Sequence, residues 1–253
     1  MTAGAPPITP SPAAPDDDRA TPPDFAHVTT WIFDLDNTLY HPSARLFDQI
    51  EDKMRRYITS SLGISLAQAD ALRAEYWAQY GTTLAGLIAH HQIDPMHFLD
   101  DVHDIDMTVL PPDASLAAAI AALPGRRIIH TNGDARYAER VLAARGLDAL
   151  FDAIYGIEHT GFVPKPAASA YDDIHARDGF DPTRAAMFED EARNLIEPHA
   201  RGMRTVLVHD RSPRGPHVDW HTQDLHGFLS QLAQPDWSAR PGHLSETHGS
   251  HDT

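Results

Sequence analysis

The 253-residue sequence contains no cysteine, which excludes disulfide bonds and metal sites built from thiolates. It also contains no apolar run near the roughly 20 residues that a membrane-spanning helix needs. Basic residues are few, because 20 lysines and arginines stand against 36 aspartates and glutamates, for a formal charge of −16. This charge disfavours nucleic acid polymers and anionic membranes as partners, because its field repels phosphates at long range. Any anionic ligand must therefore be held by local contacts.

Both ends of the sequence are poor in residues that build a core. Residues 1–24 are rich in proline and lack the basic start and apolar centre of a secretory signal. We expect a disordered lead-in there and a flexible tail over residues 233–253. The lack of cysteine fits a reducing compartment, so we expect a cytoplasmic location. The remaining chain is long enough for one sizeable domain that carries a smaller inserted one.

The spacing of apolar residues divides the chain between these ends into two kinds of segment. Residues 28–33 predict a short buried strand. Residues 43–107 show apolar spacings of three and four, which are typical of amphipathic helices, and contain no convincing strand. From residue 113 onward, predicted helices alternate with predicted strands, which cover residues 126–131, 153–157, 185–190 and 204–208.

This alternation of helices and strands indicates βαβ units, and therefore a parallel sheet with helices on both faces. The expected fold is α/β: a Rossmann-like, doubly wound parallel sheet with an inserted all-helical domain. We assign residues 25–42 and 108–232 to the α/β core and residues 43–107 to the inserted helices. Ligands of such sheets bind beyond the carboxyl ends of the strands. The residues that follow each strand are therefore the candidates for a functional site.

Polar residues follow four of the predicted strands. They are Asp34 and Asp36 after the first strand, Thr131, Asn132 and Gly133 after the second, Lys165 in the loop after the third, and Glu189 with Asp190 after the fourth. Because these strand ends meet at one edge of a parallel sheet, we expect the side chains to share one pocket.

This set of side chains suits phosphoryl transfer. The carboxylate of Asp34 can attack phosphorus and form an aspartyl-phosphate, which splits one difficult displacement into two easier ones. Asp36 can protonate the leaving oxygen and later take a proton from water. Oxygen ligands from Asp34 and Asp190, with a backbone carbonyl and waters, suit Mg²⁺. Lys165 and Thr131 can neutralise and hydrogen-bond the phosphate oxygens.

Four short motifs, in this order, resemble those of the haloacid dehalogenase (HAD) superfamily: DLDNT at 34–38, TNG at 131–133, PKP at 164–166 and FED at 188–190. The helical block between the first two motifs is similar to the α-helical cap of the superfamily's first subclass. The resemblance implies Asp34 as nucleophile, Asp36 as acid/base and Lys165 as the charge bridge. It also implies a phosphate-binding segment at Thr131, Asn132 and Gly133, and a Mg²⁺ cofactor held by Asp34, Asp36 and Asp190, with Glu189 as an alternative ligand.

Within the superfamily, FDLDNTLYHP and YGTTLAGL resemble the pyrimidine 5′-nucleotidase branch, which removes phosphate from UMP and CMP. The sequence departs from many relatives at Glu191, where they carry a small serine-like residue. This departure leaves open whether Glu189, Asp190 or Glu191 holds the metal, and Asn194 is expected to support that site. Candidate substrate contacts, for which packing between cap and core is at least as good an interpretation, are Tyr40, His41, Tyr80, Thr82 and Thr83.

Each motif taken alone has a structural alternative. DLDNT could begin an EF-hand loop, but that loop would need glycine where Leu39 stands and glutamate where Arg45 stands. Helix capping alone could explain the polar residues at 131–133 and 190, and Lys165 could be an ordinary surface lysine. His90, His91, His97 and His103 lack the i, i+4 spacing of a helical zinc pair, so we expect them to be solvated. His130 is expected to be a packed strand residue.

The function expected from these features is a Mg²⁺-dependent phosphomonoesterase with a small phosphorylated substrate. Another small phosphate ester, such as phosphoglycolate or a sugar phosphate, is an alternative substrate. A β-phosphoglucomutase-like mutase would share all four motifs, and a 2-haloacid dehalogenase would also use an aspartate nucleophile, although it needs neither Asp36 nor the acids at 189–190. A non-catalytic binding module is disfavoured because every chemical position is filled. The sequence does not indicate an oligomeric state.

Overall fold

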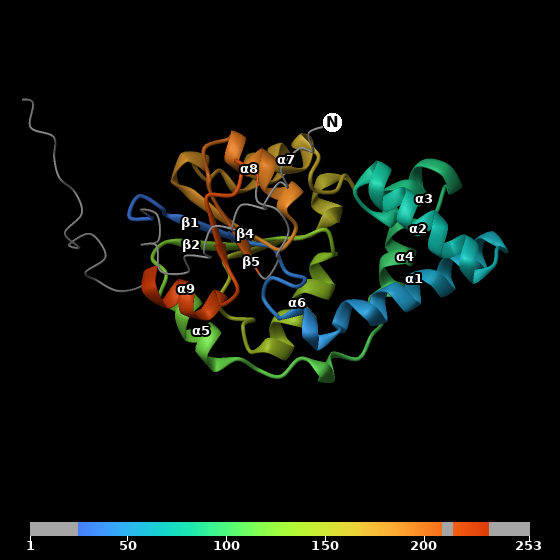
Figure 1. The fold of residues 1–253 in the computed structure, drawn as a ribbon, viewed down its shortest axis with the longest axis horizontal. Helices are drawn as coiled ribbons and strands as arrows, with labels where there is room; N and C mark the ends of the chain where they lie inside the picture. Colours follow the sequence, from blue (N-terminus) through green and yellow to red (C-terminus); the bar gives the residue numbers. More distant parts are fainter. Residues whose placement is uncertain (1–24, 209–214, 233–253) are drawn as a thin grey trace, which may run out of the picture.

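The computed structural model describes residues 25–208 and 215–232, so the predicted lead-in (1–24) and tail (233–253) lie outside the described residues (Figure 1). The strands are β1 (Thr30–Phe33), β2 (Arg126–His130), β3 (Ala153–Tyr155), β4 (Ala185–Glu189), β5 (Arg204–Val208) and β6 (Trp220–Thr222). The α-helices are α1 (Leu46–Leu62), α2 (Leu66–Tyr80), α3 (Thr83–His91), α4 (Pro95–Val102), α5 (Ala114–Ala121), α6 (Ala135–Arg145), α7 (Ala168–Asp178), α8 (Ile196–Ala200) and α9 (Leu225–Leu232). Short 3-10 helices are η1 (Pro42–Ala44), η2 (Met107–Val109), η3 (Ile157–Thr160), η4 (Pro182–Arg184) and η5 (Ala192–Leu195).

The six strands form one sheet in the order β3-β2-β1-β4-β5-β6, and every neighbouring pair is parallel. From β1 the chain moves outward through β2 and β3, and then crosses back to place β4 on the other side of β1. The strand order therefore reverses at β1, and ligands of such sheets bind beyond the carboxyl ends of the strands at this point. The doubly wound α/β fold predicted from the sequence is confirmed.

Side chains of the central strands alternate between two apolar layers, because successive residues of a strand point to opposite faces. Trp31 and Phe33 belong to the layer between the sheet and helices α5, α6 and α9, whereas Ile32 belongs to the layer between the sheet and α7, on the opposite face (Figure 1). Phe33 stacks on Phe188 of β4 with 4.7 Å between ring centroids. Burying a side chain of this size contributes about 1.5–3 kcal/mol, so the two layers fix the register of β1 against its neighbours.

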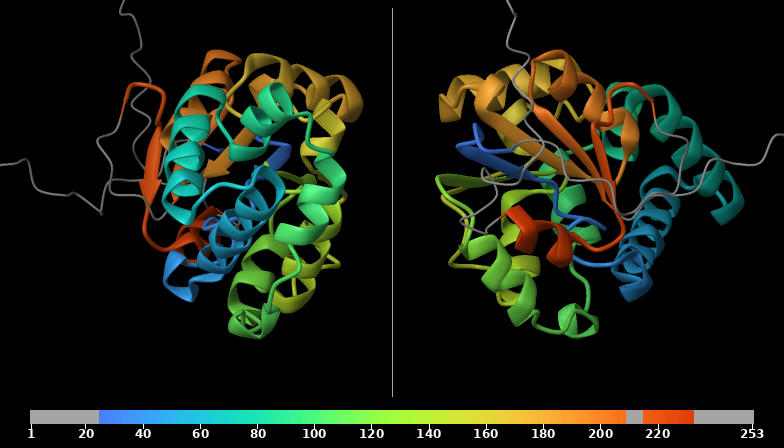
Figure 2. Two further views of the ribbon diagram at one scale, coloured as in Figure 1. Left: turned by 90° about the vertical axis from the view of Figure 1, so that its right-hand side faces the viewer. Right: turned by 60° about the vertical axis from the view of Figure 1, so that its left-hand side comes forward.

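Helices α1–α4 form a separate group between β1 and α5, and they lie beside the sheet in Figure 1 and in front of it in the left view of Figure 2. Helix α2 begins with a capping box between Ser65 and Gln68, which satisfies orphan amide groups at its start. Gly86 lets α3 approach α2 closely, because a Cβ there would lie 2.2 Å from the ring of Tyr76. We refer to these four helices as the cap.

Two parts of the fold differ from the elements expected from the sequence. The helix expected between the predicted strands at 185–190 and 204–208 is a 3-10 turn, η5, followed by the five-residue helix α8. Pro198 has no N–H for the carbonyl of Asn194, which instead accepts a hydrogen bond from the hydroxyl of Tyr171 at 2.6 Å. The second difference is β6 with α9, which the apolar pattern did not reveal because the edge strand β6 is only half-buried. Within the residues that the structure describes, no helix is long and apolar enough to cross a bilayer.

Candidate active site

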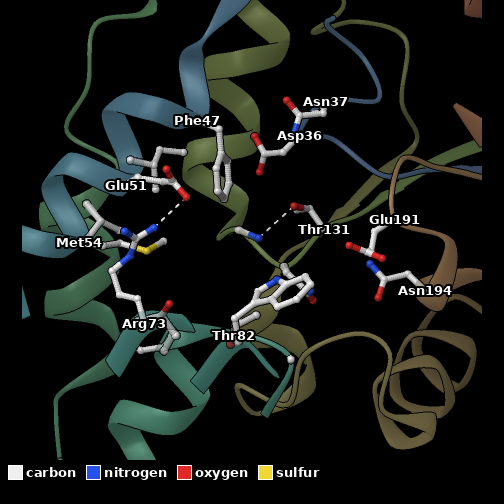
Figure 3. Close-up of a pocket in the computed structure, with 18 of the residues that line it drawn as sticks. Asp36, Asn37, Phe47, Glu51, Met54, Arg73, Thr82, Thr131, Glu191 and Asn194 are labelled. Carbon is white, nitrogen blue, oxygen red and sulfur yellow. Dashed lines mark hydrogen bonds and ion pairs between the residues drawn. The ribbon is translucent and has the colours of Figure 1, made fainter. Parts of the chain in front are cut away.

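The polar residues predicted from the strand ends meet at the carboxyl edge of the sheet, around β1. Asp34 directly follows β1, Thr131 follows β2, and Glu189 ends β4. A cavity of about 730 Å³ opens there, between this edge and the cap. Figure 3 shows Asp36 and Thr131 on one side of the cavity, with residues of α1 and α2 opposite them.

Lys165 is buried at the base of this site, with a side chain that is 1% exposed. Its Nζ donates to Oδ1 of Asp34 at 2.7 Å, to Oε2 of Glu189 at 2.6 Å and to the carbonyl of His130 at 2.9 Å. Burial alone would lower the pKa of Lys165, but the carboxylates of Asp34 and Glu189 outweigh it and raise that pKa. The lysine is therefore a fixed positive charge between two strand ends.

Asn132 holds the backbone of the lysine loop. Its Oδ1 accepts from the N–H of Lys165 at 2.8 Å, and its Nδ2 donates to the carbonyl of the same residue at 3.2 Å. The hydroxyl oxygen of Thr131 accepts from the N–H of Gly133 at 2.9 Å. All three residues of the predicted phosphate-binding segment, 131–133, line the cavity. The amide group of Asn132, however, is already used to position Lys165.

Asp34, Glu189 and Asp190 each place a carboxylate oxygen within 4.8 Å of the other two. Burial and the charge of Glu189 raise the pKa of Asp34 to about 8, against the lowering effect of Lys165. Burial and the same glutamate raise the pKa of Asp190 well above its ordinary value. When all three groups are ionised, one ammonium leaves two of their negative charges unbalanced, and this repulsion adds to burial in raising both pKa values. Oxygen-only donors are those that Mg²⁺ prefers. These residues therefore fit a divalent cation such as Mg²⁺.

The sequence left open which of three consecutive acids belongs to this group. Glu189 and Asp190 are members, whereas Glu191 lies beside them and donates its N–H to Oε1 of Glu189 at 3.2 Å. The carboxylate of Asp36, predicted as a further ligand, is not among the three. Asn194 is buried and lines the cavity next to the acids, where its placement agrees with a supporting role.

Asp36 faces the cavity from the loop after β1 and is held by two tyrosines. Its Oδ1 accepts from the hydroxyl of Tyr40 at 2.7 Å and from that of Tyr137 at 2.6 Å. Burial raises the pKa of Asp36, and these two hydrogen bonds partly oppose that rise. Tyr137, in the first turn of α6, was not identified from the sequence, because it lies 101 residues from Asp36 and outside every motif.

The candidate substrate contacts divide into two groups. Thr82 and Thr83, at the start of α3, line the cavity. Tyr40 is turned toward Asp36, His41 is exposed and caps η1, and the hydroxyl of Tyr80 contacts His90. The structure places these last three side chains off the cavity wall.

The cap contributes cavity residues that the sequence did not single out, namely Phe47, Glu51 and Met54 of α1 and Arg73 and Trp77 of α2 (Figure 3). Arg73 donates through Nη2 to Oε1 of Glu51 at 2.8 Å. Such residues carry the same helical spacing as packing residues, so their pattern could not distinguish a cavity wall from a core.

The cap and the core also meet at Arg193, which follows the acidic group. Its guanidinium lies 3.9 Å from the ring centroid of Trp77, and its Nη2 donates to the carbonyl of Gly81 at 3.3 Å. The end of α2 is thereby attached to the loop after β4.

The expectation that four cap histidines are solvated is wrong for His103. This residue directly follows α4 as its C-cap, is buried, and places Nδ1 2.6 Å from Oδ2 of Asp134. Its ring also stacks on Tyr137 with 4.0 Å between centroids, which removes it from water. His130 is a packed strand residue as predicted, and burial lowers its pKa well below the ordinary value.

Comparisons with known proteins agree with this geometry. A family model described as haloacid dehalogenase-like hydrolase matches residues 28–196. Phosphate metabolism protein 8 of Saccharomyces cerevisiae is 26% identical over 194 residues, which cover 70% of this chain and 60% of the yeast protein. The chain thus spans about 60% of the length of that relative.

Solved structures show the same fold at low sequence identity. A HAD phosphatase from Thermococcus onnurineus gives a TM-score of 0.56 at 19% identity, over 81% of this chain and 98% of the other. L-2-haloacid dehalogenase from Xanthobacter autotrophicus gives a TM-score of 0.52 at 18% identity, over 81% of this chain and 97% of the other. The HAD-hydrolase YfnB from Bacillus subtilis, bound to magnesium, gives a TM-score of 0.51 at 17% identity, over 79% of this chain and 96% of the other.

Proposed function

Because this chain belongs to the haloacid dehalogenase-like hydrolase family, we propose that it is a Mg²⁺-dependent phosphomonoesterase acting on nucleoside 5′-monophosphates, with UMP and CMP as the expected substrates. The observation that carries this proposal is that Asp34 and Asp36 line one cavity while the buried ammonium of Lys165 is bonded to Asp34. A nucleophile, an acid and a fixed cation at one point are the parts that a two-step phosphate hydrolysis needs.

In the first step, the carboxylate of Asp34 attacks phosphorus and the bond to the ester oxygen breaks. Asp36 gives its proton to that oxygen, so the leaving group departs as a neutral alcohol. In the second step, Asp36 takes a proton from water, and the water attacks the aspartyl-phosphate. Inorganic phosphate then leaves and the free carboxylate of Asp34 is restored.

Charge balance supports the assignment of these roles. A phosphate dianion entering beside three carboxylates meets repulsion that Lys165 alone offsets only in part. Asp34, Glu189 and Asp190 would hold Mg²⁺, which supplies the missing positive charge when bound. Lys165 lowers the pKa of Asp34 against the effect of burial and so favours its ionised form, and its hydrogen bond fixes the carboxylate in direction for attack.

The cavity supports a leaving group of nucleoside size. Its volume lies in the range of roughly 300–1,000 Å³ that is usual for sites of drug-sized ligands, and is large for phosphoglycolate. Phe47 and Met54 give the cap side an apolar wall, and Arg73 with Glu51 adds a donor and an acceptor (Figure 3). A pyrimidine ring offers two flat faces and an edge with both donors and acceptors, which suits such a wall.

The test is phosphate release from UMP, CMP, AMP, phosphoglycolate and sugar phosphates, with Mg²⁺ and with EDTA. We expect turnover of UMP and CMP that requires Mg²⁺ and is abolished in Asp34→Asn, whereas the exposed Asp148→Asn serves as a control that retains activity. Undiminished turnover by Asp34→Asn would refute the mechanism. Release of halide from 2-chloropropionate without metal would instead assign the site to dehalogenation.

A further inference from the structure

Two buried tyrosines donate to the same oxygen of Asp36. The hydroxyls of Tyr40 and Tyr137 lie 2.7 and 2.6 Å from Oδ1. The two residues reach this atom from different elements, the loop after β1 and the first turn of α6, and are 2% and 1% exposed. Among the described residues, Oδ2 of Asp36 makes no hydrogen bond, although this side chain lines the cavity (Figure 3). The two carboxyl oxygens therefore have different surroundings.

Both tyrosines keep their protons, so both act as donors. Burial, followed by the nearby charge of Asp36, raises the pKa of Tyr40 and of Tyr137 far above the ordinary value for tyrosine. An oxygen that already accepts two O–H bonds is the less favourable place for a further proton. The acidic proton of Asp36 then belongs on the other oxygen.

We propose that Tyr40 and Tyr137 are positioning residues that make Oδ2 of Asp36 the oxygen through which the proton is transferred. This inference rests on the proposed function, in which Asp36 is the general acid. The Oδ2–H bond breaks as the ester oxygen takes the proton and the P–O bond opens, and Oδ2 later accepts the proton of the attacking water. The hydroxyls stabilise the negative charge left on Asp36 between these events, since hydrogen bonds to a carboxylate are stronger than neutral ones.

Contacts with the ring and backbone of Tyr137 fix the position of its hydroxyl. The ring of His103 stacks on that of Tyr137 at 4.0 Å and 15°, and His103 is held by Asp134 at 2.6 Å. Asp134 also accepts from the N–H of Tyr137 at 2.9 Å. Asp134 therefore fixes both the imidazole ring of His103 and the backbone of Tyr137. Gly133 also lies close to the ring, because a Cβ there would come within 2.9 Å of Tyr137 Cδ1. Little free space is left around the ring, so its hydroxyl stays at Asp36.

The experiment separates proton transfer from general damage by varying the leaving group. A nucleoside 5′-oxygen needs a proton as it departs, whereas p-nitrophenolate leaves readily without one. We therefore compare the kcat/KM value for UMP with the value for p-nitrophenyl phosphate. The parameter kcat/KM reports only the steps up to departure of the leaving group, so it excludes hydrolysis of the aspartyl-phosphate. The variants are Tyr40→Phe, Tyr137→Phe and the double variant, each of which removes one or both hydroxyls and keeps the rings.

Since a general acid contributes about 10²–10⁴-fold, we expect kcat/KM for UMP to fall roughly tenfold in each single variant and about 100-fold in the double variant. The value for p-nitrophenyl phosphate should change less than about threefold, because its leaving group needs little of that assistance. Tyr76→Phe is the matched control, since Tyr76 is also buried and its hydroxyl is bonded to His91 at 2.7 Å, within the cap. It should leave both values unchanged.

Equal losses for the two esters, or no loss for UMP, would overturn the inference. Thermal unfolding of each variant identifies any that fails to fold, and the two single variants test the idea independently. If the wild-type protein hydrolyses neither ester with Mg²⁺, the proposed function fails instead. If it hydrolyses both and the variants lose both equally, only the role of the tyrosines is rejected.

Discussion

Replacing Lys165 by methionine tests the buried ion pairs on which the site depends. The change removes an ammonium with three hydrogen bonds of 2.6–2.9 Å and leaves the buried carboxylates of Asp34 and Glu189 without their cation. Breaking a buried pair by removing one partner costs about 3–5 kcal/mol. For a chain of this size each kcal/mol corresponds to roughly 2–4 °C, so we expect the Tm of Lys165→Met to fall by about 6–20 °C.

The measurement is thermal and urea unfolding in EDTA at neutral pH, so that no bound cation replaces the lost charge. Lys53→Met is the control, because Lys53 also pairs with an aspartate, Asp104, at 3.3 Å, but the two side chains are 30% and 81% exposed. We expect it to lose less than about 1 kcal/mol. Adding Glu189→Gln to Lys165→Met should recover about 1–3 kcal/mol, because the two side chains are in direct contact. A loss below about 1 kcal/mol in Lys165→Met would refute the paired, buried arrangement, since only exposed pairs contribute that little.

Three further results are expected. Millimolar Mg²⁺ should raise the Tm of the wild-type protein by balancing the carboxylates, and Asp190→Asn should lose most of that rise. Arg73→Met should raise the KM for UMP about tenfold, which is the equivalent of one charged hydrogen bond, and should leave the KM for p-nitrophenyl phosphate almost unchanged. Burial raises the pKa of Asp134, but hydrogen bonds from His103 and the Tyr137 N–H outweigh it and lower that pKa. This carboxylate therefore stabilises the fold above its unfolded pKa, near 3.9, and the advantage over Asp134→Asn should shrink as the pH falls below about 4.

Each of these results has its own contrary outcome. An equal Mg²⁺ response in Asp190→Asn would place the cation elsewhere. Arg55→Met is the control for Arg73, because Arg55 pairs with the cavity residue Asp70 but is not among the residues that line the cavity. Equal effects of Arg55→Met and Arg73→Met on the KM for UMP would argue against a contact between Arg73 and the substrate. A constant difference between wild type and Asp134→Asn from pH 7 to pH 2 would argue against the lowered pKa.

The sequence was sufficient to predict the parallel sheet and the convergence of its strand ends, because both follow from local patterns. Central strands such as β1 and β4 are buried on both faces, so residues 31–33 and 185–188 form apolar runs, and the acids at the ends of these runs must lie at the sheet's edge. The half-buried edge strand β6 has no such pattern and was missed.

The side-chain contacts within the site could not be predicted in the same way. The packing of whole helices brings Tyr137 to Asp36 and Arg73 to the cavity, and the helical spacing of both residues is that of any amphipathic segment. His103 was wrongly expected in water, because its burial depends on Asp134 and Tyr137, which lie 31 and 34 positions further along the chain. Such contacts depend on tertiary structure, which periodicity does not encode.

The ammonium of Lys165 has three protons, and three acceptors already take them. A phosphate oxygen can therefore gain a direct bond from this nitrogen only by displacing one of the present acceptors. The carbonyl of His130 is uncharged, and so it is the acceptor whose exchange would cost least. Otherwise the lysine acts on an incoming anion through its field alone, as a permanent counter-charge below the nucleophile.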